Sequence, residues 1–600
     1  MSFEISKEAA KSLLNSDANV AVLSHWFGNG FLLRVKYNPD LVQAVRQIPS
    51  AKWIAQERAY LINLFDFPAF FDLARSFALD VRFEEGSIAK VSELKSNLKF
   101  LSDEAKSKQV LEPEGIKIKM RGYQILGSQF MYYAKRCLNA DAPGSGKTIQ
   151  SIAAVVLNKN AGNGHKTLVV VPNSVKWNWK AEVDKTCDLK AIVLDSNGIK
   201  RHRQYEEDMG NSDMYIMSYD SFMADWEELI SFFHPNILIL DEAHRLSNRS
   251  NRITKIMIGG KGLRKSFLTA CQTIHSIYLL TGTPIVNKIE DLYPLIKIID
   301  PTMYDVIGFR ERYMKVKECK KNINGKIIKF PLILGYKNTD EIKKRLKPFM
   351  IRRTKDEIIS ELPKVTIKTL EIELSKEERE YYDKLKQDYK NSFRASSLLG
   401  NKITPEILNW FMKAQLICDS MELVEESNIK KSSKLEELIK TVNDNIEENK
   451  VVIFTKFRKM LHIIERELAK YKPLIIHGDV KDIDRQKAID EFRNNPERRL
   501  FISTLAAGGV GINLTVGDKN DITMILYDRW YSAALNNQAI SRSFRMGQER
   551  PIEVIILRCK DTIEEHIEKI WANKELISSD LINDDEVFKK LSYEQIINLI

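Results

Sequence analysis

Residues 141–148 read DAPGSGKT, a loop with two glycines that ends in a lysine and a threonine. Backbone N–H groups of such a loop face phosphate oxygens, and a helix predicted over residues 149–158 adds the positive end of its dipole. Lys147 brings a point charge to the β- and γ-phosphates of a nucleotide, and Thr148 brings a hydroxyl to Mg²⁺. The motif usually begins with glycine, where this chain has Asp141, so taken alone the match is weakened.

A second motif, DEAH, occupies residues 241–244 and follows the apolar run at residues 237–240. Asp241, at the end of a buried strand, can hold Mg²⁺ through water, and Glu242 can orient or deprotonate the attacking water. A solvated acidic strand end is the plain alternative. That alternative does not explain why the carboxylates follow the phosphate loop in the same predicted sheet, so we predict hydrolysis of a nucleoside triphosphate.

A third element, QAISRSFR at residues 538–545, places Arg542 and Arg545 three residues apart. In a helix the two side chains share one face. Such arginines can neutralise charge on a transferring phosphoryl group, the role of an arginine finger. A basic helix face is the alternative, but beside the loop and DEAH we favour the finger, with ATP between two lobes.

The fold class is predicted to be α/β, with two parallel-sheet lobes and helical insertions. Short β-rich runs alternate with helical stretches in two separate regions. Strands are expected at residues 167–172, 214–219, 237–241 and 277–281, and again at 451–455, 474–477, 500–504, 522–527 and 552–557. In the second region, helices are expected at residues 458–471 and 482–493.

Outside the two lobes the chain changes character. A small α+β module at the start has expected strands at 31–37 and 52–63 and helices at 39–48 and 67–78. A lysine-rich helical segment lies between the lobes, with a hairpin around residues 324–325. The predicted domains are residues 1–91 (module), 92–115 (charged linker), 116–305 (first lobe), 306–434 (helical protrusion and connector) and 435–600 (second lobe).

Composition narrows the class of protein. The 600 residues exceed one core, at about 150 residues per domain. No apolar run approaches the ~20 residues that cross a bilayer, and the first ten residues lack a signal-peptide core. Six scattered cysteines form no C-x-x-C pair, so no zinc site or disulfide framework is indicated. The net charge of +11 favours a polyanionic partner, nucleic acid above all, although basic proteins without one are common. We expect an intracellular protein without membrane contact.

The motif series resembles the Swi/Snf-like branch of superfamily-two nucleic-acid-dependent ATPases over about residues 120–581. Asp141 matches that branch's own loop, which removes the doubt about the first position. The other matching stretches are RGYQ at 121–124, VPNS at 171–174 with Asn178 and Trp179, Ser218-Tyr219, LTGTP at 280–284, RRTK at 352–355, residues 503–514 and QAISRSFRMGQ at 538–548. One departure is that Tyr531 stands at the family's tryptophan position, with Ser532-Ala533 in place of Asn-Pro.

The resemblance implies two RecA-like lobes that track along duplex DNA with ATP and Mg²⁺. Binding should be salt-sensitive with weak sequence preference, because phosphate contacts carry no base information. Thr281 and Thr283 would couple nucleotide state to lobe closure. The implied nucleotide-binding residues are Gln124, Asp141, Gly144, Ser145, Gly146, Lys147, Thr148 and Gln538. The implied DNA-binding residues are Pro172, Asn173, Ser218, Tyr219, Thr504, Gly508 and Asn513.

The first hundred residues are similar to the HARP module of annealing helicases, which implies binding of branched DNA and fork remodelling. Basic residues there (Arg34, Lys36, Arg46 and Lys52) alternate with Trp53 and Tyr60, a combination that suits single strands or junctions. An unrelated α+β domain with an ordinary core is the alternative.

Three other functions remain open at this point: a remodeller of protein–DNA complexes, a strand-separating repair helicase, and a scaffold without catalysis. We expect a monomer, and recruitment by single-strand-binding or other replication and repair proteins is left open. The protein would lie in the cytoplasm or nucleoid of a bacterium or phage-infected cell, or in a eukaryotic nucleus.

Overall fold

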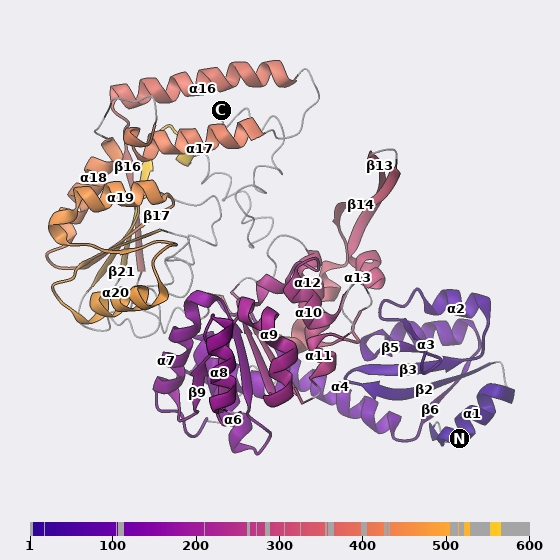
Figure 1. Cartoon of the computed structure of the whole chain (residues 1–600). Coiled ribbons are helices and arrows are strands. Elements are labelled where there is room, and N and C mark those ends of the chain that lie inside the picture. The colour runs from indigo at the N-terminus through magenta and orange to yellow at the C-terminus, as the bar shows by residue number, and fades with distance from the viewer. Residues whose placement is uncertain are drawn as a thin grey trace. The chain divides into compact units, whose positions relative to one another are not determined.

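The computed structural model (Figure 1) describes residues 4–16, 19–103, 105, 113–208, 210–260, 265–271, 273–282, 289–304, 306–323, 326–354, 357, 365–397, 405–424, 429, 432–504, 514, 521–528 and 552–565. The chain divides into two compact units, Met1–Asp141 with Lys147–Arg352, and Ala142–Gly146 with Arg353–Ile600. No helix among the described residues is long and apolar enough to cross a bilayer.

A parallel sheet of seven described strands forms the core of the first lobe, in the order β15-β7-β12-β11-β8-β10-β9. Its central strands are buried along their length, as expected where helices cover both faces. The strands are β7 (Arg136–Asn139), β8 (Thr167–Val171), β9 (Ala191–Val193), β10 (Met214–Ser218), β11 (Ile237–Asp241), β12 (Ser276–Leu280) and β15 (Met350–Ile351). The helices are α5 (Gly122–Ala134), α6 (Lys147–Asn160), α7 (Lys176–Thr186), α8 (Gly198–Asp208), α9 (Tyr219–Phe232), α10 (Arg252–Ile258), α11 (Phe267–Ala270), α12 (Leu292–Ile299), α13 (Val306–Tyr313) and α14 (Thr339–Leu346).

The second lobe holds a parallel sheet of six described strands in the order β16-β21-β20-β17-β19-β18. They are β16 (Val365–Ile372), β17 (Lys450–Thr455), β18 (Leu474–Ile476), β19 (Leu500–Thr504), β20 (Ile522–Leu526) and β21 (Ile552–Cys559). Three described helices pack against this sheet: α18 (Ser433–Asn445), α19 (Arg458–Glu467) and α20 (Asp482–Asn494). The predicted fold class, two parallel-sheet lobes, is therefore confirmed.

One strand of the second lobe lies where the sequence predicted a helical connector. β16 pairs in parallel with β21 over eight residues, from Val365↔Ile552 to Ile372↔Cys559. The prediction missed β16 because its apolar residues are interrupted by Lys368 and Glu371, as suits an edge strand with one exposed face. The second sheet thus begins inside residues 306–434.

The rest of that segment is mixed. β13 (Met314–Ile323) and β14 (Lys326–Tyr336) form the expected antiparallel hairpin, in which Ile323 pairs with Lys326. α16 (Lys376–Ser397) and α17 (Pro405–Asp419) are the expected helices, and they pack through Tyr382, Trp410 and Phe411.

The N-terminal module, residues 4–103, has its own sheet with the order β1-β6-β2-β3-β5-β4. The helices α2 (Pro39–Val45) and α3 (Phe67–Ser76) cover one face through a core that includes Leu41, Phe67 and Phe70. The strands are β1 (Glu4–Ile5), β2 (Val20–Phe27), β3 (Gly30–Val35), β4 (Lys52–Ile54), β5 (Ala59–Asn63) and β6 (Asp80–Glu84). The helices are α1 (Lys7–Ser16), α2 (Pro39–Val45), α3 (Phe67–Ser76) and α4 (Ser87–Asp103).

Helix α4 corrects the predicted linker at residues 92–115, whose first twelve residues are helical. Val91, Leu94, Leu98 and Leu101 recur at intervals of three and four, which gives the helix an apolar stripe among its charged residues. Leu98 packs against both the module core and the core of the first lobe. The described helical part of the segment, up to Asp103, is therefore a packed connection.

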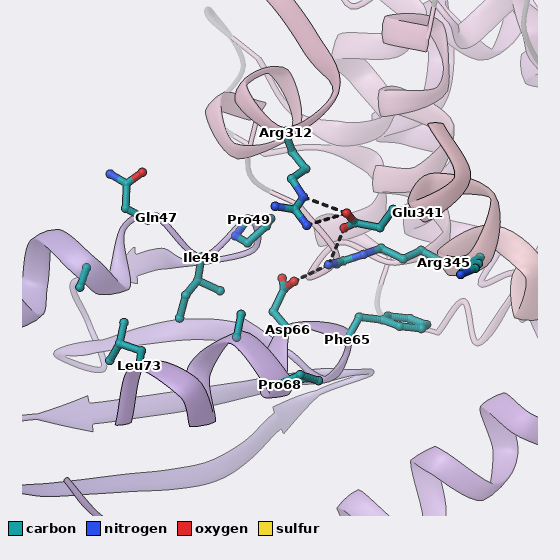
Figure 2. A pocket seen from close by; sticks show the side chains of 13 residues that line it. Gln47, Ile48, Pro49, Phe65, Asp66, Pro68, Leu73, Arg312, Glu341 and Arg345 are labelled. Atoms are coloured by element: carbon teal, nitrogen blue, oxygen red, sulfur yellow. Dashed lines mark hydrogen bonds and ion pairs between the residues drawn. The ribbon is translucent and has the colours of Figure 1, made fainter. Parts of the chain in front are cut away.

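The module is joined to the first lobe by buried polar contacts. Asn63 Nδ2 donates to Asp300 Oδ2 at 3.1 Å and to Thr302 Oγ1 at 2.8 Å. A second contact joins Asp66 to Arg345 on α14, and Arg345 also reaches Glu341 at 3.0 Å (Figure 2). All six residues belong to one compact unit, so module and first lobe form one body.

This contact lies at the amino edge of the lobe's sheet. α12 returns from the carboxyl end of β12 and ends beside the start of β7, where Arg136 donates to the Ile298 carbonyl at 3.5 Å. Asp300 and Thr302 follow directly. The phosphate loop follows the opposite, carboxyl end of β7, so the module is attached to the edge away from Lys147.

Candidate active site

The phosphate loop connects β7 to α6. Gly144 and Gly146 have φ of 86° and 76°, a left-handed conformation that side chains with a Cβ rarely adopt, and this accounts for glycine at both positions. Lys147 is the first residue of α6, and its Nζ donates to the Asp141 carbonyl at 2.8 Å. Thr148 follows, half-buried, at the helix start. Ser145 is fully buried.

The carboxylate of Asp141 faces the helix that follows the loop. Its Oδ2 accepts from Gln150 Nε2 at 3.2 Å, and its backbone N–H donates to Asn139 Oδ1 at 3.1 Å. Asn139 in turn donates to Gln150 Oε1 at 2.9 Å. All three side chains are buried. This closed network fixes the start of the loop, and the predicted nucleotide contact of Asp141 stays a prediction.

Asp241 ends β11 and is held from three directions. Its Oδ2 accepts from Trp179 Nε1 at 2.8 Å and its Oδ1 from the Glu242 N–H at 2.9 Å, while Tyr219 donates its hydroxyl to the Asp241 carbonyl at 2.7 Å. Burial raises the pKa of Asp241, and the neighbouring Glu242 raises it further. The Trp179 hydrogen bond opposes the shift in pKa, because it stabilises the ionised carboxylate.

Glu242 has φ of 51° and ψ of 48°, a left-handed backbone that costs a non-glycine residue about 1–2 kcal/mol. Strain of this kind gathers at functional sites. His244 Nδ1 lies 3.3 Å from Glu242 Oε2 and 3.3 Å from Thr281 Oγ1. His244 therefore connects the carboxylate predicted to act on water with the threonine predicted to couple it to lobe closure.

Strand register brings these groups to one edge. Leu280, the last residue of β12, pairs with Asp241 on one side and with Asn139 on the other. The phosphate loop, the DEAH carboxylates and Thr281 therefore follow the carboxyl ends of three adjacent strands. Ligands of open parallel sheets bind at this edge.

Gln124, predicted to read adenine, lies near the start of α5. Its Oε1 accepts from the Arg121 N–H at 3.0 Å, and its side chain is 2% exposed. Here the side chain caps the helix, and its adenine contact remains a prediction.

The predicted DNA-binding residues fall into two groups. Asn173 is exposed after β8, and Pro172 precedes it. Ser218 and Tyr219 are buried: the Ser218 hydroxyl caps α9 by accepting from the Ser221 N–H at 3.0 Å. Thr504 ends β19 in the second lobe. The remaining predicted residues, Thr283, Gly508, Asn513, Gln538, Arg542 and Arg545, lie outside the described residues.

Sequence reasoning missed the contacts of Trp179, Asn139 and Gln150. Trp179 lies 62 residues from its partner, so no local spacing announces the pair. The available signal was a tryptophan on a predicted helix that is otherwise largely polar.

The donor atoms at this edge fit Mg²⁺, a hard cation that is bound through one or two carboxylates together with phosphates and water. Trp179 and Glu242 take one acceptor position on each oxygen of Asp241, and a carboxylate offers about four. Asp241 therefore retains capacity for the water shell of the ion, and the Thr148 hydroxyl supplies a second oxygen.

Comparisons with known proteins agree with the motif series. A model of the SNF2-related domain matches residues 47–423, and a model of the helicase conserved C-terminal domain matches residues 430–547. An uncharacterized ATP-dependent helicase, MG018, of Mycoplasma genitalium is 29% identical over 467 residues, or 77% of this chain and 42% of that protein. The human SWI/SNF-related matrix-associated actin-dependent regulator of chromatin subfamily A member 1 is 26% identical over 509 residues, or 80% of this chain and 46% of that protein. The chain thus spans less than half the length of these relatives.

A solved structure, the Sulfolobus solfataricus SWI2/SNF2 ATPase core in complex with dsDNA, is 26% identical and covers 82% of this chain and 99% of that one, with a TM-score of 0.36. The predicted Swi/Snf-like resemblance is confirmed by the family models, while the HARP likeness stays a prediction. Since the first model alone spans more than half of its residues, the chain belongs to the SNF2-related family.

Proposed function

We propose that the protein is a DNA-dependent ATPase that tracks along duplex DNA and remodels or anneals branched DNA. The observation that supports it most is the common edge at which Lys147, Asp241 with Glu242, and Thr281 follow three adjacent strands. Family membership and the net charge of +11 support a nucleic-acid partner.

In this proposal each residue has a separable task. The loop N–H groups and Lys147 bind the β- and γ-phosphates, and Asp241 with Thr148 would hold Mg²⁺, which neutralises charge on the phosphates when bound. Glu242 accepts a hydrogen bond from the attacking water and takes its proton. His244 holds Glu242 in place through one 3.3 Å contact. Through its second 3.3 Å contact it links the position of the Glu242 side chain to that of Thr281.

The test is the ATPase rate in the presence of single strand, duplex, fork, junction and RNA. Duplex or branched DNA should stimulate hydrolysis, and added salt should weaken the stimulation steeply because phosphate contacts release counterions. If none of these nucleic acids stimulates hydrolysis, the proposal is wrong.

Exposed groups of the N-terminal module support the branched-DNA part of the proposal. Trp53 on the edge strand β4 is 50% exposed and meets Tyr60 edge-on, with ring centroids 4.9 Å apart, and Lys52 beside it is exposed. Tyr60 itself is core, and Arg34 is engaged with Glu57 at 3.1 Å. Trp53 is therefore the candidate stacking platform.

Trp53→Ala should weaken fork binding about 5- to 150-fold, the equivalent of the ~1–3 kcal/mol of one stacked base. The control is Trp26→Ala, which removes another half-exposed tryptophan of the same module. Equal fork affinity in Trp53→Ala and the unaltered protein would contradict the proposed role of this module in binding branched DNA. The proposal of a DNA-dependent ATPase would still stand.

A remodeller of protein–DNA complexes is the second candidate, and the name of the human chromatin regulator favours it. Displacement of a protein bound to unbranched duplex, with no annealing of a coated bubble, would select this function. Release of a displaced strand would select a strand-separating helicase.

A further inference from the structure

Two aromatic side chains hold the predicted metal-binding carboxylate: Trp179, which lies in a motif that matches the family, and Tyr219, which that resemblance implies to bind DNA. The motif series gives neither residue a role at the metal site. Trp179 Nε1 donates to Asp241 Oδ2 at 2.8 Å, and the Tyr219 hydroxyl donates to the Asp241 carbonyl at 2.7 Å. Trp179 is 1% exposed and Tyr219 is 4% exposed. The side chain and the backbone of Asp241 are therefore each held by a buried aromatic residue.

Each aromatic residue belongs to a segment that is predicted to contact DNA. Trp179 lies on α7, which starts three residues after Asn173. The 3₁₀ turn Asn173–Val175 leads directly into this helix, without an intervening loop. Asn173 Oδ1 accepts from Ser196 Oγ at 3.0 Å, and Lys176 Nζ donates to the same hydroxyl at 2.8 Å. Displacement of Asn173 would therefore be transmitted to the indole of Trp179.

Tyr219 makes the equivalent connection from the other segment. It begins α9 directly after Ser218, and the exposed guanidinium of Arg245 stacks over its ring, 5.8 Å from the centroid. A phosphate that attracted Arg245 would change the surroundings of the ring whose hydroxyl holds Asp241.

The geometry argues against a purely space-filling role for Trp179. A core position needs volume, which phenylalanine or leucine supplies without a polar atom to satisfy. Here the indole N–H is directed at one carboxylate oxygen. A hydrogen bond to a charged group is stronger than one between neutral groups, so this contact favours one orientation of the Asp241 side chain.

We propose that Trp179 and Tyr219 are positioning residues that make the orientation of the Asp241 carboxylate, and with it the affinity for Mg²⁺-nucleotide, depend on duplex DNA at the Asn173 and Ser218 segments. This inference rests on the proposed function. Coupling of two ligands is reciprocal, so DNA must tighten Mg²⁺-nucleotide binding by the same factor by which Mg²⁺-nucleotide tightens DNA binding.

The experiment measures binding without turnover. The dissociation constant of Mg²⁺ with a non-hydrolysable ATP analogue is determined with and without a saturating duplex, and that of the duplex with and without the analogue. The unaltered protein should show a coupling factor of at least about fivefold, the low end of known allosteric couplings. When EDTA removes Mg²⁺, the dissociation constant of the analogue should be the same with and without DNA.

Trp179→Phe keeps the ring and deletes the N–H, and should reduce the coupling factor to below twofold while leaving duplex affinity without nucleotide unchanged. Tyr219→Phe should lower the factor as well, and it serves if Trp179→Phe does not fold. The matched control is Trp177→Phe, two residues away on the same helix and 52% exposed, which should keep the full factor.

Full coupling in both Trp179→Phe and Tyr219→Phe would overturn the inference, and so would equal loss in Trp177→Phe. A protein whose ATPase is stimulated by DNA but whose analogue binding ignores DNA would also overturn it and leave the proposed function standing. Absence of any DNA binding or stimulation would instead remove the proposed function.

Discussion

Asn63 of the N-terminal module donates its side-chain amide to the Thr302 hydroxyl of the first lobe at 2.8 Å, and both groups are buried. Two glycines permit this close approach. A Cβ on Gly30 would lie 2.7 Å from Thr302 Cγ2, and a Cβ on Gly308 would lie 2.1 Å from the Pro49 carbonyl oxygen. The module is therefore fitted to the amino edge of the lobe, and any DNA it binds moves with that lobe.

Gly308→Ala should loosen this fit. The added methyl meets backbone, which cannot rotate away, so we expect a loss of about 1–3 kcal/mol in stability, as for other overpacked sites. Gly335→Ala is the control, because a Cβ there meets nothing within 4 Å. The rate of hydrogen exchange at the backbone N–H of Asn63 should rise in Gly308→Ala and stay unchanged in Gly335→Ala. Unchanged protection there would mean that the module is not held by this contact.

The buried pair of Arg345 and Asp66 should be sensitive to removal of one partner (Figure 2). Arg345→Met leaves Asp66, 2% exposed, without its counter-charge, so urea unfolding should show a loss of about 3–5 kcal/mol. Arg345→Met with Asp66→Asn should cost less than Arg345→Met alone. Lys343→Met on the same helix removes an exposed charge and should stay within about 0.5 kcal/mol. A double variant as unstable as the sum of the singles would contradict the pairing.

A buried charge cluster in the second lobe predicts a pH dependence of stability. Lys434 Nζ lies 3.2 Å from Asp419 Oδ1 and 2.6 Å from Glu564 Oε1. Burial raises the pKa of Asp419 well above its usual range, the Asp528 carboxylate raises it further, and Lys434 opposes the shift. Asp419 Oδ2 is buried and has no hydrogen-bond partner among the described residues, so nothing on that oxygen stabilises the ionised form.

The sign follows from proton uptake on folding. A carboxyl group whose pKa is raised in the folded state stabilises that state below the unfolded pKa, and this stability is lost as pH rises towards the folded pKa, by up to about 1.4 kcal/mol per pH unit. The pKa of Lys434 is raised as well, so its contribution stays constant below its unfolded value. The unaltered protein should therefore lose stability as the pH rises from 5 to 8, whereas Asp419→Asn should not. The free energy of unfolding of Asp419→Asn should thus increase relative to that of the unaltered protein over this range. Urea midpoints at both pH values measure this, and a difference that does not change with pH would exclude Asp419 as the source.

The sequence predicted those features that depend on local pattern. Strand β11 has the predicted bounds, and β8, β10 and β12 differ from the predicted strands by one residue, because buried parallel strands are continuous apolar runs ended by polar turns. Helix α4 and strand β16 escaped prediction because charged residues interrupt their apolar positions. Pairings such as Trp179 with Asp241, or Asn63 with Thr302, depend on tertiary packing between distant segments, and no spacing in the chain encodes them.

Glu242→Gln tests the chemistry of the site with little change to its shape. The amide keeps the side-chain volume and can still receive a hydrogen bond from the attacking water, but it cannot take the proton. We expect ATP binding within about twofold of the unaltered protein and DNA-stimulated hydrolysis at least ~100-fold slower, the size typical of acid–base contributions. Glu227→Gln, an exposed carboxylate on α9, should hydrolyse ATP at the normal rate. The left-handed backbone at residue 242 is already strained, so unfolding curves of Glu242→Gln should be compared as well. A slow variant with normal stability and normal ATP binding identifies Glu242 as the base, whereas near-normal turnover would assign the proton to another group.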